Sequence, residues 1–371
     1  MSKISKKISV LIGIVVLFLT GFSPGQLENE GTDAANIQLT QSDTSEFPMV
    51  TLYLSITDDR GEPLGVSPQE IRIIEDDQLI TPDQFSGMGE VSELKTLLVM
   101  DISGSMNSGG KLQAAKSAAL AYVEQMRPGD KAGLMTFNTK IDLVQELTRD
   151  VQELNAVINQ LTAKNDTAMY DALVKAVDYL DSFSGRKAVI VLTDGLDNRS
   201  TNNAQDVVER IGPTGLSIST IGLGDPSHGK GAQTALDQGA LEDLAKSAGG
   251  VYGYADDEVS LLNLYELYGR VLQSEYQITY TSPSSIRDGV NRSLEVYLET
   301  VPADVGMGKY NPGGLVPETG QPVSWSLFFF LFSGLLLLLA LPKIIKFGYQ
   351  LLRKKDEKAV KFQVSRIKLK D

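Results

Sequence analysis

The stretch KTLLVMDISGSM, residues 95–106, decides how the middle of this chain folds. Residues 95–101 contain the run TLLVM at 96–100, which is typical of a strand buried on both faces of a parallel sheet. The run ends at Asp101, and a loop with two hydroxyl side chains, Ser103 and Ser105, follows. Because sites in α/β sheets lie beyond the carboxyl ends of the strands, the stretch predicts a polar site there.

Short apolar runs and amphipathic segments alternate on the C-terminal side of this stretch. Further strands are predicted at 132–137, 141–147, 188–193, 217–222 and 251–252. Helices are predicted at 111–126, 151–161, 168–183, 204–211, 241–248 and 258–274. Strands that alternate with helices indicate an α/β domain with a doubly wound, mostly parallel sheet, here over residues 93–275.

A second carboxylate is predicted at the same edge of the sheet, because Asp194 follows the strand at 188–193. Two carboxylates and several hydroxyls make a set of oxygen ligands. Such a set suits a hard cation, Mg²⁺ with Mn²⁺ or Ca²⁺ as alternatives. The chain has no cysteine and one histidine, His228. This composition excludes thiolate chemistry and argues against a zinc site.

Three segments resemble motifs of the von Willebrand factor A (VWA) domain family. DISGSM at 101–106 resembles the first metal-site loop, NDTAMYDAL at 165–173 the threonine loop, and VLTDG at 191–195 the second aspartate. The resemblance spans about Glu93 to Ser274 and implies the Rossmann-like VWA fold. It also implies a metal-ion-dependent adhesion site for Mg²⁺, with one coordination position open to a Glu or Asp carboxylate of a protein partner. The residues that the resemblance assigns to this site are Asp101, Ser103, Ser105, Thr167 and Asp194.

Two pairs of residues modify this pattern. Asn165 and Asp166 stand where the family usually has Gly-Gly, and they add a carboxylate beside the expected site. Asp197 and Asn198 follow the second aspartate. We expect them to cap the next turn, with tuning of the metal site as the alternative.

Two β-rich segments, 47–92 and 276–302, flank the predicted VWA domain. Each is too small to fold alone, so we expect them to pair into one small β domain. The first also resembles the region ahead of A domains in bacterial surface proteins. The polar segment 27–46 predicts a linker, and the Gly- and Pro-rich segment 303–322 predicts a stalk.

The two ends of the chain predict that the protein is located in a membrane. Residues 1–26 carry three lysines before a short apolar run, which is typical of a signal peptide, with an N-terminal anchor as the alternative. Residues 323–342 are uncharged and long enough to cross a bilayer as one helix, with a buried core helix as the weaker alternative. The basic tail 343–371 follows, and the positive-inside rule places such a tail in the cytosol. We therefore expect a single-pass cell-membrane protein with its VWA domain outside the cytosol.

The segment Val316–Gly320 resembles a sortase sorting signal, so processing there is a further alternative.

The net charge of −13 conceals a strong asymmetry. The tail 343–371 holds ten basic residues against three acids, whereas in residues 27–342 the acids outnumber the bases by 23. An acidic surface of this kind disfavours nucleic acid as a partner.

These expectations combine into one function, a membrane-anchored, extracytoplasmic protein that binds a protein ligand through Mg²⁺ and is not an enzyme. The first alternative is an assembly or scaffold subunit of a membrane complex. The second is a metal-dependent hydrolase in which Asp166 or Asp197 activates water. The motifs contain no obvious general acid or nucleophile, which argues against the hydrolase.

Overall fold

The computed structural model describes residues 35–88, 90–91, 93–164, 166–213, 215–224, 236–299, 304–314, 329–336, 338, 340–343 and 345–346. The chain divides into two units, Met1–Pro317 and Glu318–Asp371. All the named helices and strands belong to the first unit.

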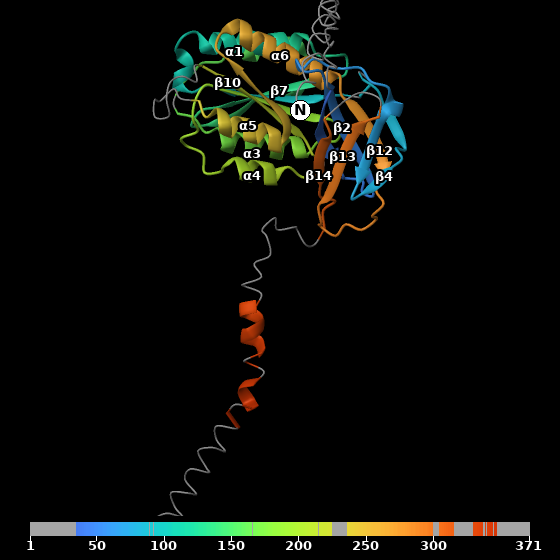
Figure 1. Ribbon diagram of the computed structural model, residues 1–371. Helices are drawn as coiled ribbons and strands as arrows, with labels where there is room; N and C mark the ends of the chain where they lie inside the picture. Colours follow the sequence, from blue (N-terminus) through green and yellow to red (C-terminus); the bar gives the residue numbers. More distant parts are fainter. Residues whose placement is uncertain are drawn as a thin grey trace, which may run out of the picture. The chain divides into compact units, whose positions relative to one another are not determined.

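A six-stranded sheet with the order β11-β10-β9-β6-β7-β8 forms the centre of the first unit (Figure 1). Five of its strands run parallel, and β8 joins the edge antiparallel to β7. β7 and β8 correspond to the strands predicted at 132–137 and 141–147, and a short turn joins them into an antiparallel hairpin. The bounds are β6 (Lys95–Asp101), β7 (Lys131–Phe137), β8 (Ile141–Thr148), β9 (Lys187–Thr193), β10 (Ser217–Leu223) and β11 (Gly249–Ala255).

Helices cover both faces of this sheet, as the buried strands require. All seven residues of β9 are buried, so neither face of that strand meets water. One apolar layer contains α1 (Lys111–Glu124), α2 (Val151–Asn159) and α6 (Glu258–Gln273). The opposite layer contains α3 (Met169–Asp181), α4 (Ala204–Arg210) and α5 (Gln238–Ser247). The predicted α/β class with a doubly wound, mostly parallel sheet is confirmed.

A β-sandwich of two four-stranded antiparallel sheets lies beside this α/β domain (Figure 1). The sheets have the orders β1-β2-β12-β5 and β14-β13-β3-β4, and their facing residues share one apolar core. Pairing of β2 with β12 and of β3 with β13 joins the two segments that flank the α/β domain in the sequence. The bounds are β1 (Asn36–Asp43), β2 (Met49–Thr57), β3 (Ile71–Glu75), β4 (Gln78–Ile80), β5 (Gln84–Ser86), β12 (Tyr276–Thr281), β13 (Arg292–Leu298) and β14 (Gly306–Tyr310); two 3₁₀ turns are η1 (Pro68–Glu70) and η2 (Gly104–Asn107).

Two outer strands of the sandwich correct the sequence prediction. The expected linker over 27–46 is wrong for Asn36–Asp43, which form β1, and the expected stalk over 303–322 is wrong for Gly306–Tyr310, which form β14. The two strands pack on each other. A Cβ on Gly306 would lie 2.7 Å from Ile37, and one on Gly308 would lie 2.2 Å from Leu39. The glycines that suggested a flexible stalk are thus the residues that let β14 approach β1.

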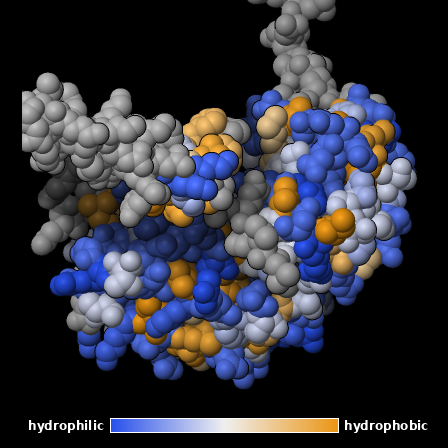
Figure 2. All heavy atoms as spheres, turned by 90° about the horizontal axis from the view of Figure 1, so that it is seen from below, coloured by the Kyte–Doolittle hydropathy of each residue, from blue (hydrophilic) through white to orange (hydrophobic). Residues whose placement is uncertain are grey.

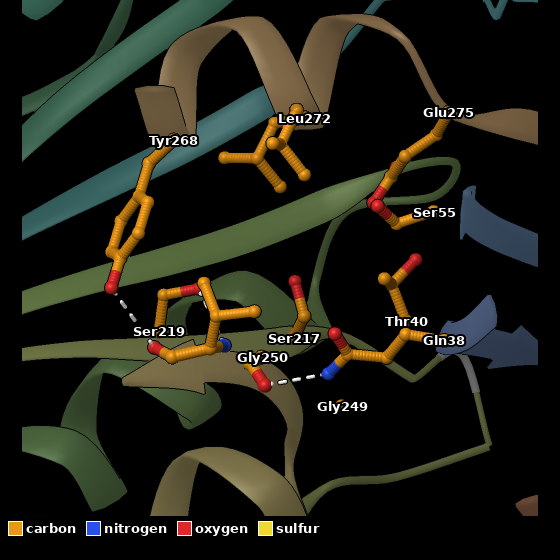
Figure 3. A pocket seen from close by; sticks show the side chains of 12 residues that line it. Gln38, Thr40, Ser55, Ser217, Ser219, Gly249, Gly250, Tyr268, Leu272 and Glu275 are labelled. Carbon is orange, nitrogen blue, oxygen red and sulfur yellow. Dashed lines mark hydrogen bonds between the residues drawn. The ribbon is translucent and has the colours of Figure 1, made fainter. Parts of the chain in front are cut away.

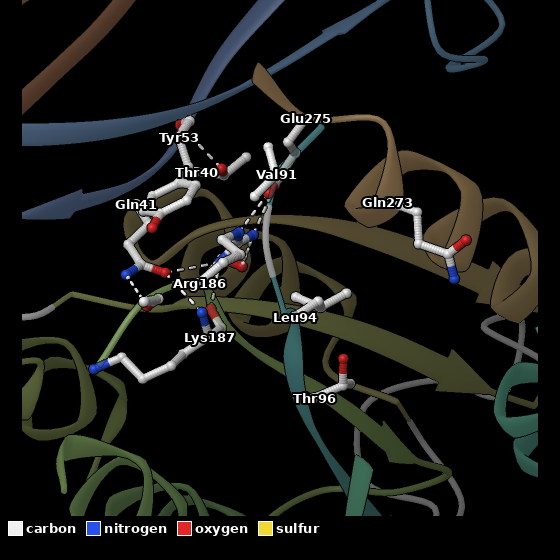
Figure 4. Close-up of polar contacts among 12 residues, drawn as sticks. Thr40, Gln41, Tyr53, Val91, Leu94, Thr96, Arg186, Lys187, Gln273 and Glu275 are labelled. Atoms are coloured by element: carbon white, nitrogen blue, oxygen red, sulfur yellow. Dashed lines mark hydrogen bonds and ion pairs between the residues drawn. The ribbon is translucent and has the colours of Figure 1, made fainter. Parts of the chain in front are cut away.

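A buried arginine joins the sandwich to the amino end of the central sheet (Figure 4). Arg186, next to β9, forms a bidentate pair with Glu275, which immediately precedes β12, and its Nη2 lies 2.7 Å from Glu275 Oε1. The same guanidinium donates to Gln41 of β1 at 3.1 Å and to Ser217 of β10 at 2.8 Å. Arg186 and Glu275 are both at most 1% exposed. We call this network the seam.

A small cavity lies beside the seam and is lined from both domains (Figure 3). Its volume is about 20 Å³, which is room for a single water molecule. Gln38 of β1 reaches across and donates to the Gly250 carbonyl at 2.6 Å. The backbones of β11 and β1 approach closely here, because a Cβ on Gly249 would lie 2.6 Å from the Thr40 carbonyl oxygen. Close backbone approach therefore accounts for the Gly-Gly pair.

Gly250→Ala is expected to destabilise the chain by about 2 kcal/mol or more. The new methyl would lie 2.0 Å from the Ile218 carbonyl oxygen, which is part of the β10 backbone and has little freedom to move. Gly239→Ala in α5 is the matched control, because its nearest neighbour is 3.8 Å away and alanine favours helix. Urea unfolding of both variants measures the difference. Equal stability of the two would contradict the close approach.

In the second unit, the described residues 329–336 and 340–343 are helical. No helix among the described residues is long and apolar enough to cross a membrane. The predicted span at 323–342 lies only partly within the described residues. The predicted signal peptide at 1–26 and the segment Val316–Gly320 lie outside them, as does most of the basic tail.

Candidate metal centre

Asp101 ends β6 and is fully buried. Its Oδ1 accepts from the Ser103 amide at 2.8 Å, and its Oδ2 accepts from the Thr193 hydroxyl at 2.7 Å. Burial, with a further contribution from the nearby Asp194 charge, raises the pKa of Asp101 to about 6. A bound cation would favour the ionised carboxylate and oppose this shift.

The two serines of the first loop lead from Asp101 to the second aspartate. The hydroxyls of Ser103 and Ser105 lie 2.9 Å apart, and Ser105 Oγ donates to Asp194 Oδ1 at 2.6 Å. Asp194 follows β9 directly and is fully buried. Its other oxygen, Oδ2, lies 2.8 Å from the ammonium of Lys111. Four of the five expected site residues therefore lie together at neighbouring strand ends, and the sequence did not indicate Lys111.

Thr167 is the fifth expected residue, and it is buried. It belongs to the threonine loop, which lies beside the loop that carries Ser103 and Ser105. The amide of Lys164 in this loop donates to the Ile102 carbonyl at 2.8 Å. Asn198 holds Thr167 on both sides: its side chain accepts from the Thr167 amide, and its own amide donates to the Thr167 carbonyl, each at 3.2 Å. Asn198 thus fixes the threonine loop, a role that the sequence expectation of a cap did not include.

Asp197 caps two segments at once. One oxygen, Oδ1, accepts from the Ser200 amide at 2.8 Å, as expected of a turn cap, and the other accepts from the Tyr170 amide at the start of α3 at 2.9 Å. Asp166, the extra carboxylate of the threonine loop, pairs with Arg199. Asn165 lies outside the described residues. These contacts give Asp166 and Asp197 structural partners, which weighs against their use as a base.

The chemistry of these side chains fits a hard cation. Two buried carboxylates and neighbouring hydroxyls are oxygen donors of the kind that Mg²⁺ prefers. The described residues contain no group of three or more His, Cys, Asp or Glu that could hold a metal ion, so serine and threonine hydroxyls would have to complete a site around the two aspartates. The positively charged ammonium group of Lys111 already forms an ion pair with Asp194. The residues present therefore fit Mg²⁺.

Comparison with known proteins shows what the α/β domain is similar to. Residues 96–196 match the family described as von Willebrand factor type A domain. An uncharacterised protein of Synechocystis sp. is 26% identical over 189 residues, covering 48% of this chain and 41% of its own length. Human inter-alpha-trypsin inhibitor heavy chain H4 is 25% identical over 214 residues, covering 53% of this chain and 22% of its own. This chain thus spans less than half the length of both relatives.

Among solved structures, a von Willebrand factor type A protein from Catenulispora acidiphila aligns with a TM-score of 0.45 and 15% identity. The alignment covers 77% of this chain and 74% of that one. All five expected site residues lie within the segment that matches the family, 96–196. The part of the chain that is similar to the von Willebrand factor type A family is therefore residues 96–196 of the α/β domain.

Proposed function

We propose that this chain is a membrane-anchored protein whose VWA domain lies outside the cytosol and binds a protein ligand through Mg²⁺. The residues that would hold the cation are Asp101, Ser103, Ser105, Thr167 and Asp194. A bound Mg²⁺ supplies a hard, positively charged centre that accepts a carboxylate oxygen from a partner. The observation that carries the proposal is the hydrogen-bonded chain from Ser103 through Ser105 to Asp194, next to buried Asp101.

Hydrogen bonds hold the loops of the site in place, which suits a surface that binds a partner. Asn198 ties the loop after β9 to the threonine loop, and Asp197 ties it to the start of α3. Lys164 ties the threonine loop to the first loop at Ile102. Apart from the parts drawn in grey, the face of the molecule seen from below in Figure 2 is largely hydrophilic, with apolar residues scattered over it. An acidic domain repels an acidic partner, so the cation would supply both the attraction and the geometry of recognition.

Capture of a protein partner by the immobilised full chain is expected in MgCl₂ and lost in EDTA. Extracellular proteins from cells that produce the chain are the source of ligands, and mass spectrometry compares the two eluates. Proteins retained in Mg²⁺, released by EDTA and not retained by an Asp101→Asn chain support the proposal. Retention that is unchanged by EDTA and by the substitution would contradict it. Turnover of a phosphoester panel that requires Asp101 would favour a hydrolase instead.

The proposed placement rests on the uncharged segment 323–342 and the basic tail that follows it. In intact cells, protease added from outside is expected to remove the VWA domain and leave a membrane-bound fragment with the tail. Protection of the VWA domain in intact cells, with cleavage only after lysis, would place it in the cytosol and favour the scaffold alternative.

A further inference from the structure

We propose that Lys111 is a resident cation of the candidate metal centre, which neutralises Asp194 when no metal is bound and must leave before a divalent cation binds tightly. This inference rests on the metal centre of the proposed function. It adds a competitor that belongs to the chain itself.

The geometry gives Lys111 the place of a counter-ion. Its ammonium lies 2.8 Å from Asp194 Oδ2, while Ser105 occupies Oδ1 at 2.6 Å. Both oxygens of the fully buried Asp194 are therefore satisfied without a metal. Among the described residues, Lys111 is the cation that forms an ion pair with a buried carboxylate of the site, and that carboxylate is Asp194.

The position of Lys111 is unusual for a helix. It is the first residue of α1, and the first turn of that helix carries no acid. The positive end of the helix dipole disfavours a lysine there. The preceding Gly109 and Gly110 have φ of +62° and +74°, which suits glycine and directs the chain into the helix at this point. A cation at a helix start is explained by the buried anion that it contacts rather than by helix stability.

Release of the ammonium is feasible because the Lys111 side chain is 20% exposed at the rim of the site, whereas Asp194 is 0% exposed. A divalent cation and an ammonium at the same carboxylate repel each other, so one displaces the other. The released ammonium would add positive charge beside the open face. The chain would thus favour an acidic partner more strongly once it is loaded.

The experiment compares Mg²⁺ binding to the full chain and to two variants by titration calorimetry. Lys111→Met is expected to bind Mg²⁺ about tenfold more tightly than the parent chain, because the competitor is gone. Lys116→Met is the matched control. It removes the same charge from the same helix, but Lys116 contacts the Asn159 carbonyl instead of the site. Its affinity is expected to stay within about twofold of the parent.

A second readout needs no metal. Lys111→Met leaves the buried Asp194 without its counter-ion, so its melting temperature in EDTA is expected to fall below that of the parent and of Lys116→Met. Mg²⁺ is expected to raise the melting temperature of Lys111→Met more than that of the parent.

The outcomes separate this inference from the proposed function. Tighter Mg²⁺ binding by Lys111→Met, including binding where the parent shows none, supports the resident cation. Unchanged or weaker binding by Lys111→Met, in a parent that does bind Mg²⁺, overturns it and leaves the metal centre standing. No binding by either chain overturns the metal centre and this inference together.

Discussion

Replacing Asp101 with asparagine is expected to lower the affinity of the chain for Mg²⁺ by about 100-fold or more and to leave the fold intact. Asparagine keeps the shape of the side chain, and its oxygen still accepts from the Ser103 amide. It removes one of the two buried anions that attract the cation. The folded chain tolerates the neutral group because burial already disfavours the ionised carboxyl, whose pKa is raised to about 6.

Titration calorimetry with MgCl₂ measures the affinity, and thermal unfolding in EDTA tests the fold. Asp150→Asn is the control. It removes one acidic charge from an exposed helix cap that accepts from the Gln152 and Glu153 amides, and asparagine caps helices as well as aspartate does. The control is expected to bind Mg²⁺ like the parent. Equal Mg²⁺ affinity of the Asp101→Asn chain and the control would refute a metal centre at this position.

Replacing Arg186 with methionine is expected to destabilise the chain by about 3–5 kcal/mol, the largest stability loss that we predict. Glu275 is fully buried, and its charge would lose a bidentate partner. Gln41 and Ser217 would each lose a hydrogen bond in the same step. A loss of this size corresponds to a fall of about 10 °C in the melting temperature.

Arg270→Met is the matched control, because Arg270 of α6 pairs with Glu62 of the sandwich across the same two domains. That pair is 45% and 47% exposed, so the variant is expected to lose at most about 1 kcal/mol. The double variant Arg186→Met with Glu275→Met is expected to recover much of the loss, since it removes both buried charges. A loss for Arg186→Met no larger than for Arg270→Met would show that the seam does not hold the domains together.

The α/β domain could be predicted from the sequence because each of its elements has a clear pattern. The strand at 95–101 has an apolar centre, LLVM at 97–100, and the predicted helix at 168–183 matches α3 within two residues at each end. The outer strands of the sandwich could not be predicted in this way. In β1 the polar Gln38 and Gln41 look exposed in the sequence, yet they reach Gly250 and Arg186 of the neighbouring domain. The alternation of polar and apolar residues along a strand does not reveal hydrogen bonds that its side chains form with another domain.

The candidate site shows the same limit. The motifs indicated its five residues, and the structure brings Asp101, Ser103, Ser105 and Asp194 together by hydrogen bonds, while their role as metal ligands stays a prediction. Lys111 was missed as a contact of the site, because its partner Asp194 lies 83 residues away in the sequence. Asn198 was expected to cap a turn, with tuning of the site as the alternative, and its contact with Thr167 across 31 residues was not foreseen. A lysine at a helix start, where the dipole disfavours it, was a signal that could have been noticed.

The way the sandwich is assembled has a consequence for synthesis of the chain on the ribosome. Strands β1 to β5 emerge first, but β2 and β3 pair with β12 and β13, and Tyr280 reaches Glu75 across 205 positions. Until those late strands emerge, the nascent chain presents an unpaired edge of β2 and an Arg186 that has no Glu275. A product that ends before Glu275 therefore exposes an unpaired strand edge and an Arg186 without its partner, and both promote aggregation or proteolysis. The β-sandwich thus becomes stable only after the ribosome has synthesised β12 and β13.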